Sequence, residues 1–436
     1  MVLPKVLIIG QTFNNTSGGG ITQSNLFSGW DPAKLAVTCT AHLLRDSDFD
    51  ICGSYYQLGQ GEHKWAFPFN YLQRKFPSGV LKFDQSTSKD KRTRKSNFRS
   101  KMVDGIFFPF LKYSGLIHWI SKIELSRDFC NWLDDFNPDI IYAQGQDRER
   151  ILFILLVHSY LKKPLIFHVM DDWPSTISDK GLFKRYWYKK IDYEFRTLLN
   201  KATLLMGISD AMANEYKIRY NKNFITFHNP ITIDFWRKTQ KTNYRLGKYP
   251  TILYAGRIGL GIKSSLELIA QTIQSINEEL DMSIKFTLQT AEKPLWSNKY
   301  LCVEHRDLVG YNDLPSAFSK ADILILPYDF SLKSIKYIQY SMPTKAPEYM
   351  ISGTPIIVFA PETTAIVKYA EKYEWAKIVA KNKSEDLSLA IKDLIQNQNL
   401  REKISRNAKK IAEEKHNSKN VANEFKNLIC SLIPSA

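Results

Sequence analysis

The chain has little that would mark a secreted or membrane-spanning protein. Its five cysteines among 436 residues are odd in number and form no C-x-x-C pair, which favours free thiols in a reducing compartment. The longest dense apolar run, residues 151–157, is far shorter than the ~20 residues that cross a bilayer. The first ten residues lack the long apolar region and cleavage site of a signal peptide. We therefore expect a cytoplasmic protein.

Common nucleotide and metal signatures are missing as well. Glycines 18–20 do not have the G-x-G-x-x-G spacing of a nicotinamide site. Lys263 and Ser264 follow glycine at the wrong spacing for a P-loop, which argues against a kinase or ATPase of that class. The sequence has no His/Cys cluster with metal-ligand spacing. We expect neither a metal nor a cofactor.

Cations, in contrast, are abundant. The formal charge of +16 comes from 60 Lys and Arg against 44 Asp and Glu, a balance that attracts polyanions, anionic lipid or a phosphorylated substrate. Residues 89–101 alone hold seven cations and one acid. This basic cluster is either a binding surface or a solvated loop.

The length and the periodicity together predict two α/β domains. A chain of 436 residues with 44% hydrophobic residues is too long for one ordinary core. Apolar segments alternate with helical ones, as in parallel, doubly wound sheets. Residues 53–120 do not fit this alternation and are expected to form an insertion. Helices are expected at 148–161, 182–199 and 264–280. Strands are expected at 6–9, 139–142, 165–169, 203–207, 251–255, 283–288, 322–326, 355–359 and 377–379.

Residues 254–263 (YAGRIGLGIK) carry an apolar strand into a glycine-rich turn. Gly256 and its neighbouring glycines allow Arg257 and Lys263 to approach a diphosphate without a side-chain barrier. The two cations would balance a charge near −2 without a metal. The alternative is a helix-start loop with solvated charges.

Residues 343–355 (PTKAPEYMISGTP) place Glu348 on a short helix before a buried strand. A carboxylate among apolar neighbours needs a partner, because burying it unpaired is costly. The two hydroxyls of a ribose would supply one. An ion pair, for instance with Lys345, is the alternative.

With these motifs in this order the chain resembles the retaining family 4 glycosyltransferases, which have the two-domain GT-B architecture. Arg257 and Lys263 match the family's diphosphate-binding cations, and Glu348 matches its ribose carboxylate. The resemblance implies an α/β fold in which two Rossmann-like domains with parallel sheets face each other across a cleft. The implied parts are an acceptor-binding domain (1–235), a nucleotide-sugar-binding domain (236–416) and a C-terminal helix crossing back to the first domain (417–436).

The resemblance also implies a set of site residues. The family often has a second Glu where this chain has Tyr340, which leaves the identity of the donor sugar open. The backbone amides near Thr344 and Lys345 remain candidates to cradle phosphate or sugar. The implied donor-binding residues are Gly19, Gly20, Gly256, Tyr311, Thr344, Lys345 and Glu348.

In the first half, residues 167–174 (FHVMDDWP) follow a predicted strand, at the end where doubly wound sheets bind ligands. The family commonly has His-Asp at this strand end, where this chain has Met170 and Asp171. His168 lies two residues earlier and would share a face with residue 170. We count His168 and Asp171 with the catalytic residues Arg257 and Lys263, although a hydrogen-bonded core histidine is an equal alternative for His168. The acceptor-side candidates are Gln144 and Asp172.

The implied reaction transfers a hexose or N-acetylhexosamine from a nucleotide diphosphate sugar, with retention of configuration. UDP-sugar is favoured as donor and GDP-sugar is the second choice; the acceptor is a glycan, a lipid-linked glycan or an anionic cell-envelope polymer, and no nucleic acid partner is expected. An epimerase or phosphorylase of the same fold, and a non-catalytic subunit of a complex, are the alternatives. Cations beside the aromatic-rich residues 102–120 further suggest peripheral binding to the inner face of an anionic membrane; the alternative is that residues 106–120 are core beneath a loop.

Overall fold

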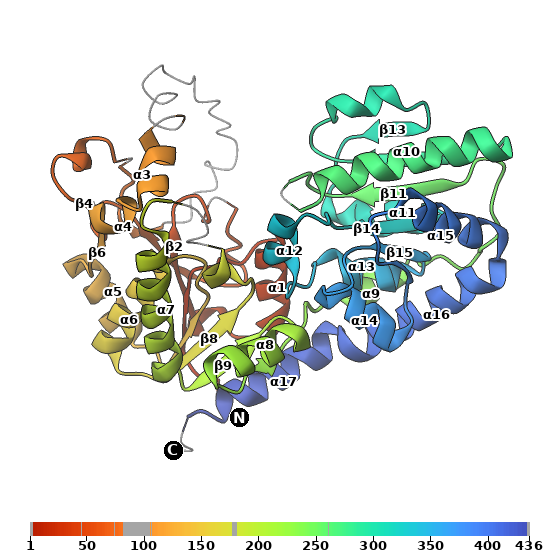
Figure 1. Ribbon diagram of the computed structural model, residues 1–436. Coiled ribbons are helices and arrows are strands. Elements are labelled where there is room, and N and C mark those ends of the chain that lie inside the picture. Colours follow the sequence, from red (N-terminus) through yellow and green to blue (C-terminus); the bar gives the residue numbers. More distant parts are fainter. Residues whose placement is uncertain are drawn as a thin grey trace. The chain divides into compact units, whose positions relative to one another are not determined.

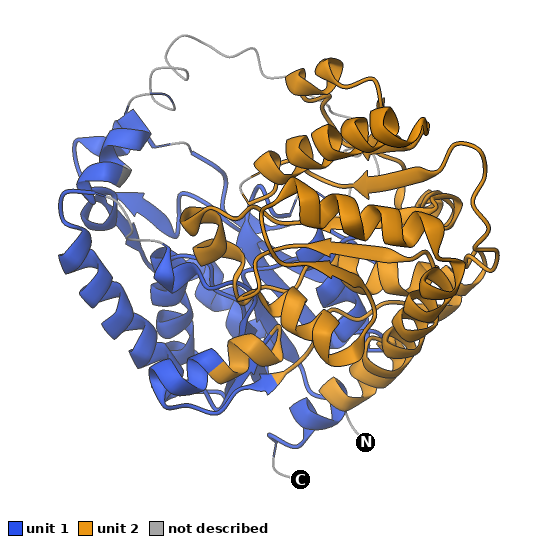
Figure 2. Ribbon diagram, turned by 45° about the vertical axis from the view of Figure 1, so that its right-hand side comes forward, with its two compact units in different colours: residues 1–207, 215–225, 426–436 blue, residues 208–214, 226–425 orange. Residues whose placement is uncertain are grey.

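The computed structural model describes residues 3–44, 46–73, 75–81, 105, 107–176, 181–259 and 261–433. The chain divides into two compact units, coloured separately in Figure 2. Unit 1 comprises residues 1–207, 215–225 and 426–436, and unit 2 comprises residues 208–214 and 226–425. The basic cluster at 89–101 lies outside the described residues.

Unit 1 is built on an eight-stranded sheet in the order β10-β9-β8-β7-β1-β2-β3-β5. Its pairings from β9 to β3 are parallel, and β5 is antiparallel to β3. Its strands are β1 (Val6–Ile9), β2 (Leu35–Thr40), β3 (Ser54–Leu58), β5 (Gly79–Val80), β7 (Ile140–Ala143), β8 (Leu165–Val169), β9 (Leu204–Gly207) and β10 (Ile225–Thr226).

Helices α5, α6 and α7 line one side of this sheet, as Figure 1 shows. A separate antiparallel pair of β4 (His63–Trp65) and β6 (Ser121–Ile123) stands outside the main sheet. The helices are α1 (Gly18–Leu26), α3 (Phe108–Ser114), α4 (Ile117–Ile120), α5 (Arg127–Phe136), α6 (Arg148–Leu161), α7 (Lys184–Lys201) and α8 (Asp210–Tyr220), whose residues 210–214 belong to unit 2.

Unit 2 is built on a six-stranded parallel sheet in the order β13-β12-β11-β14-β15-β16. Helices α10 and α15 contact each other and share one apolar core with the sheet. The strands are β11 (Thr251–Ala255), β12 (Lys285–Gln289), β13 (Val303–Arg306), β14 (Ile323–Pro327), β15 (Ile356–Phe359) and β16 (Lys377–Val379). The helices are α9 (Ile233–Arg237), α10 (Lys263–Leu280), α11 (Leu314–Lys320), α12 (Leu332–Ile338), α13 (Lys345–Ser352), α14 (Ala365–Tyr373), α15 (Ser384–Gln396), α16 (Gln398–Lys415) and α17 (Ser418–Cys430), whose residues from 426 group with unit 1.

All nine expected strands and all three expected helices form, each within two residues of its predicted ends. One expectation needs correction. Residues 54–58 do not begin an insertion but form β3, which pairs in parallel with β2 inside the main sheet. Its sequence SYYQL has no strict alternation, since Tyr55 and Tyr56 are both buried, and so short a pattern is hard to distinguish from a loop.

Candidate functional site

The site in unit 2 lies where the chain changes direction across the sheet. From β11 the chain proceeds outward to β12, whereas from β14 it proceeds outward to β15 on the other side. The carboxyl ends of β11 and β14 therefore flank a topological switch point, the place where open parallel sheets bind ligands. Gly256 directly follows β11, and Asp329 lies two residues after β14.

The turn after β11 is fixed by backbone conformation and by Asp329. Gly256 and Gly261 have φ angles of +143° and +88°, which L-residues with side chains rarely adopt. The Asp329 amide donates to the Gly261 carbonyl at 2.7 Å, and the Asp329 carboxylate accepts from the Ser265 amide at 2.9 Å. Asp329 thus holds the first turn of α10, which places Lys263 at the start of that helix.

Lys345, the first residue of α13, lies on Gly256. Its Nζ is 4.8 Å from the centroid of the Tyr254 ring and 3.5 Å from the Tyr254 hydroxyl. That hydroxyl donates to the Arg257 carbonyl at 2.6 Å. A Cβ at position 256 would stand 1.9 Å from Nζ, so only glycine leaves room for the ammonium.

Glu348 and Lys345 form a desolvated pair of opposite charges. Burial raises the pKa of Glu348 to about 7, against the opposing effect of Lys345. Burial likewise lowers the pKa of Lys345 to about 8, with Glu348 opposing and Arg257 adding to the fall. Within the described part of the chain, the two side chains do not approach within the 4 Å of an ion pair. The carboxylate therefore stays buried without the close partner that would offset its burial.

The two cations of the turn are available to a ligand. Arg257 and Lys263 are exposed, and among the residues that the structure describes neither has an ion-pair partner. Two unpaired cations in the turn after β11, together with a buried carboxylate on the helix that begins with Lys345, fit a molecule that has an anionic part and a hydroxyl-rich part. Such a molecule would complete both sets of interactions.

Tyr311 and Thr344 lie in the same part of unit 2. Tyr311 stacks on Phe235 with ring centroids 5.1 Å apart and planes 1° apart. Burial first, and Glu348 second, raise the pKa of Tyr311 to about 12. Thr344 is half-buried and immediately precedes α13.

The implied donor-binding glycines of unit 1 lie at the start of a helix. Gly18 to Gly20 form the first turn of α1 itself, because Ser17 caps the helix by accepting a hydrogen bond from the Gly20 amide at 3.2 Å. A Cβ at Gly20 would lie 2.2 Å from the Asn14 carboxamide, and one at Gly19 would lie 3.1 Å from the Gln11 side chain. Close packing therefore accounts for both glycines without a ligand.

His168 and Gln144 belong to the core of unit 1. Both are buried, and the Tyr142 hydroxyl links them, at 2.7 Å from His168 Nδ1 and 3.1 Å from Gln144 Nε2. Burial lowers the pKa of His168 to about 3, so the imidazole is neutral. His168 is therefore a hydrogen-bonded core histidine, the alternative given above. Its Nε2 is buried without a partner among the described residues.

Asp172 has a structural role as well. Its buried carboxylate accepts two hydrogen bonds from Arg219, at 2.8 and 3.2 Å, and one each from Tyr216 and Ser175, at 2.8 and 2.7 Å. These bonds fasten the turn after β8 to α8. The neighbouring Asp171 is half-buried in the same turn.

Sequence reasoning missed the residues that support the site. The Tyr254 ring contacts the Lys345 ammonium, and Asp329 orients the turn. The Tyr349 hydroxyl accepts a hydrogen bond from the Ala255 amide at 3.0 Å. Only Asp329 left a signal, as a carboxylate two residues past a buried strand.

The described residues contain neither a metal-site arrangement nor a membrane-spanning helix. No cluster of three or more His, Cys, Asp or Glu side chains there has the arrangement of a metal site. No helix there is long and apolar enough to cross a bilayer.

Comparison with known proteins finds a similarity in the unit that holds this site. Residues 237–411 match the family model described as glycosyl transferases group 1. The match contains every site residue of unit 2 named above except Phe235. Together with the structural neighbours below, it supports a glycosyltransferase with the GT-B fold. No curated protein matches the chain.

Solved structures share the fold over nearly the whole chain. A glycosyltransferase from Rickettsia africae covers 99% of this chain and 100% of its own, with TM-score 0.61 and 11% identity. Sucrose-phosphate synthase from Thermosynechococcus elongatus covers 98% of each chain, with TM-score 0.62 and 11% identity. Anabaena HepE in complex with UDP and glucose covers 98% of this chain and 100% of its own, with TM-score 0.58 and 12% identity. At these identities the likeness concerns the fold.

Proposed function

We propose that the protein is a retaining glycosyltransferase that uses a nucleotide diphosphate sugar, with UDP-sugar as the favoured donor. The observation that carries this proposal is the buried, unpaired Glu348 next to Lys345, together with the unpaired Arg257 and Lys263 of the turn at the switch point of unit 2. The match of this segment to group 1 glycosyl transferases supports it, as does a structural neighbour that holds UDP and glucose.

In this proposal the polar groups divide between the two ends of the nucleotide. Glu348 accepts hydrogen bonds from the ribose hydroxyls. These bonds replace the ones to water that the carboxylate loses on burial. Arg257 and Lys263 bind the diphosphate and stabilise the charge that develops on it as the sugar leaves. Fixed charges of this kind commonly provide the largest contribution to such catalysis. The acceptor hydroxyl attacks from the face that the diphosphate leaves and gives its proton to the leaving phosphate.

The acceptor in this proposal is a glycan, a lipid-linked glycan or an anionic polymer, as the net charge of +16 favours. Neither a metal nor a cofactor enters the proposed reaction. Arg257 and Lys263 take the place that a divalent cation would have beside the diphosphate. A melting-temperature screen with UDP-, GDP- and dTDP-sugars identifies the donor, because a ligand stabilises the folded state by mass action.

The decisive test is UDP release from the donor found in that screen. Lys263→Ala should lower turnover by about 100-fold or more, because one charge-assisted contact to the leaving group contributes on the order of 3 kcal/mol. The matched control is Lys285→Ala, an exposed lysine at the amino end of β12, the opposite edge of the same sheet. Equal rates in the two variants would refute the assignment, and NMR of the anomeric proton in the product decides between retention and inversion.

A further inference from the structure

An exposed aromatic surface lies on unit 1, on the first half of α7 and the helices beside it. Trp119 of α4 is 51% exposed, and its ring contacts Phe183 and Tyr186 at centroid distances of 6.0 and 6.4 Å. Tyr113 of α3 lies beside this group, because its carbonyl accepts a hydrogen bond from the Leu182 amide at 3.0 Å. Figure 1 shows α3, α4 and α7 on the same part of unit 1. The exposed side chains of this surface are Phe110, Tyr113, Trp119, Leu182, Phe183 and Tyr186.

Cations border these aromatic rings. Residues 184–190 (KRYWYKK) contain four basic residues and no acid. Lys184, Arg185 and Lys189 are exposed, whereas Trp187 between them is buried and anchors the helix. Aromatic and aliphatic side chains flanked by Lys and Arg are the composition that binds the headgroup region of an anionic bilayer.

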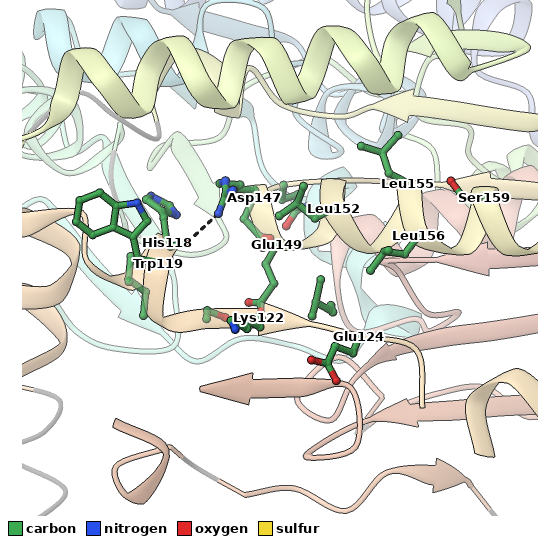
Figure 3. A pocket seen from close by; sticks show the side chains of 15 residues that line it. His118, Trp119, Lys122, Glu124, Asp147, Glu149, Leu152, Leu155, Leu156 and Ser159 are labelled. Atoms are coloured by element: carbon green, nitrogen blue, oxygen red, sulfur yellow. Dashed lines mark hydrogen bonds between the residues drawn. The ribbon is translucent and has the colours of Figure 1, made fainter. Parts of the chain in front are cut away.

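A groove of about 990 Å³ opens beside Trp119, between α6 and the segment from α4 to β6 (Figure 3). The charged side chains Arg148 and Glu149 in its wall already bond to other residues of the protein. Arg148 forms two hydrogen bonds of 2.6 Å with Glu194 and donates to the His118 carbonyl at 2.9 Å. Glu149 lies 2.9 Å from His63 and accepts from Ser121 at 2.7 Å.

The rest of the groove is mixed: an apolar stretch lines it together with Lys122, Glu124, Gln146, Asp147 and Ser159. Leu152, Leu155 and Leu156 line it along α6, and Leu156 is 39% exposed. Part of this polar lining already has partners, since Glu124 accepts from Lys64 and Asp147 accepts from the Arg150 amide. An apolar chain would cover Leu156 and the half-buried leucines beside it.

We propose that α3, α4 and residues 182–190 form a surface that docks on an anionic lipid bilayer, and that the groove beside Trp119 admits an apolar chain from that bilayer. The docking is independent of the reaction proposed above. The role of the groove rests on that function, because a lipid-linked acceptor would present such a chain.

Flotation of the full chain with vesicles tests the docking. The protein should float with equal parts of phosphatidylglycerol and phosphatidylcholine at low salt, and not with phosphatidylcholine alone. Lys184→Gln with Lys189→Gln should lower the partition coefficient about 30-fold, since each lysine near an anionic leaflet contributes about 1 kcal/mol. The control, Lys201→Gln with Lys217→Gln, removes two exposed lysines elsewhere on unit 1 and should float as wild type.

A second pair of variants isolates the aromatic part. Tyr186→Ser should weaken flotation, whereas Tyr249→Ser, which changes a tyrosine of unit 2 with similar exposure, should not. Three results would overturn the docking: no flotation with anionic vesicles, flotation that ignores both surface variants, or a surface that binds only soluble polyanion or a second copy of the chain. UDP binding of every variant is measured in parallel, so that failure of the docking is distinguished from failure of the donor site.

The groove is tested with a fluorescent long-chain fatty acid. Leu156→Glu should abolish its binding, whereas Leu389→Glu, at an exposed leucine of unit 2, should leave it unchanged. Equal binding to both variants, or none to the wild type, would contradict the role of the groove.

Discussion

The polar groups near the carboxyl ends of the parallel strands are in opposite states in the two units. In unit 1, His168, Gln144 and Asp172 bond to their own neighbours, through Tyr142, Arg219 and other side chains. In unit 2, Glu348 is buried without a close partner and Arg257 is exposed without one, within the described residues. The first cluster stabilises its fold, whereas the second leaves free energy to be gained from a ligand.

The largest expected effect is on the stability of unit 1. Asp172→Asn removes the buried anion of the Arg219 pair and leaves the guanidinium only the more exposed Glu215, and breaking a buried pair costs about 3–5 kcal/mol. The thermal midpoint should fall accordingly. The control is Asp192→Asn, which breaks the more exposed Asp192–Arg196 pair and should cost at most about 1 kcal/mol. Similar midpoints for both variants would show that Asp172 is not a structural residue.

A glycine pair in one turn tests the close approach in unit 2. Gly256→Ala places a methyl group against Lys345 and strains a positive φ, at a cost of about 1–3 kcal/mol. UDP affinity should fall about tenfold or more as Lys345 is displaced. Gly259→Ala in the same turn meets open space and should bind as wild type. Calorimetry compares UDP binding by the two variants. Equal affinities would mean that UDP binding does not depend on the close approach of Lys345 to residue 256.

The unpaired state of unit 2 also predicts how UDP binding depends on pH. Ribose binding needs ionised Glu348, so affinity should rise through a pH of about 7. A charged Lys345 adds to the positive charge beside Arg257 that attracts the diphosphate, so affinity should fall above a pH of about 8. Relative to wild type, Glu348→Gln should flatten the acid limb and Lys345→Arg the alkaline limb. Variant profiles parallel to the wild type would assign both limbs to other groups.

The sequence predicted much of the fold and only part of the site. Apolar runs such as residues 165–169 are strong signals because a strand buried on both faces has no polar alternation to interrupt it. The cations of the turn were found from motif order. The hydrogen bonds that hold Asp172 were not predicted, because its partner Arg219 lies 47 residues later and only the fold brings the two together. For the same reason no pattern showed that Lys345 lies on Gly256.

The most direct test of the account is calorimetric titration of UDP into wild type and Glu348→Gln. The amide keeps the shape but loses the charge that strengthens hydrogen bonds to ribose, worth roughly 1.5–3 kcal/mol. The account predicts a dissociation constant raised about 10- to 100-fold in a variant whose thermal midpoint does not fall. Unchanged UDP affinity in Glu348→Gln would contradict the claim that this carboxylate is kept unpaired for a ligand.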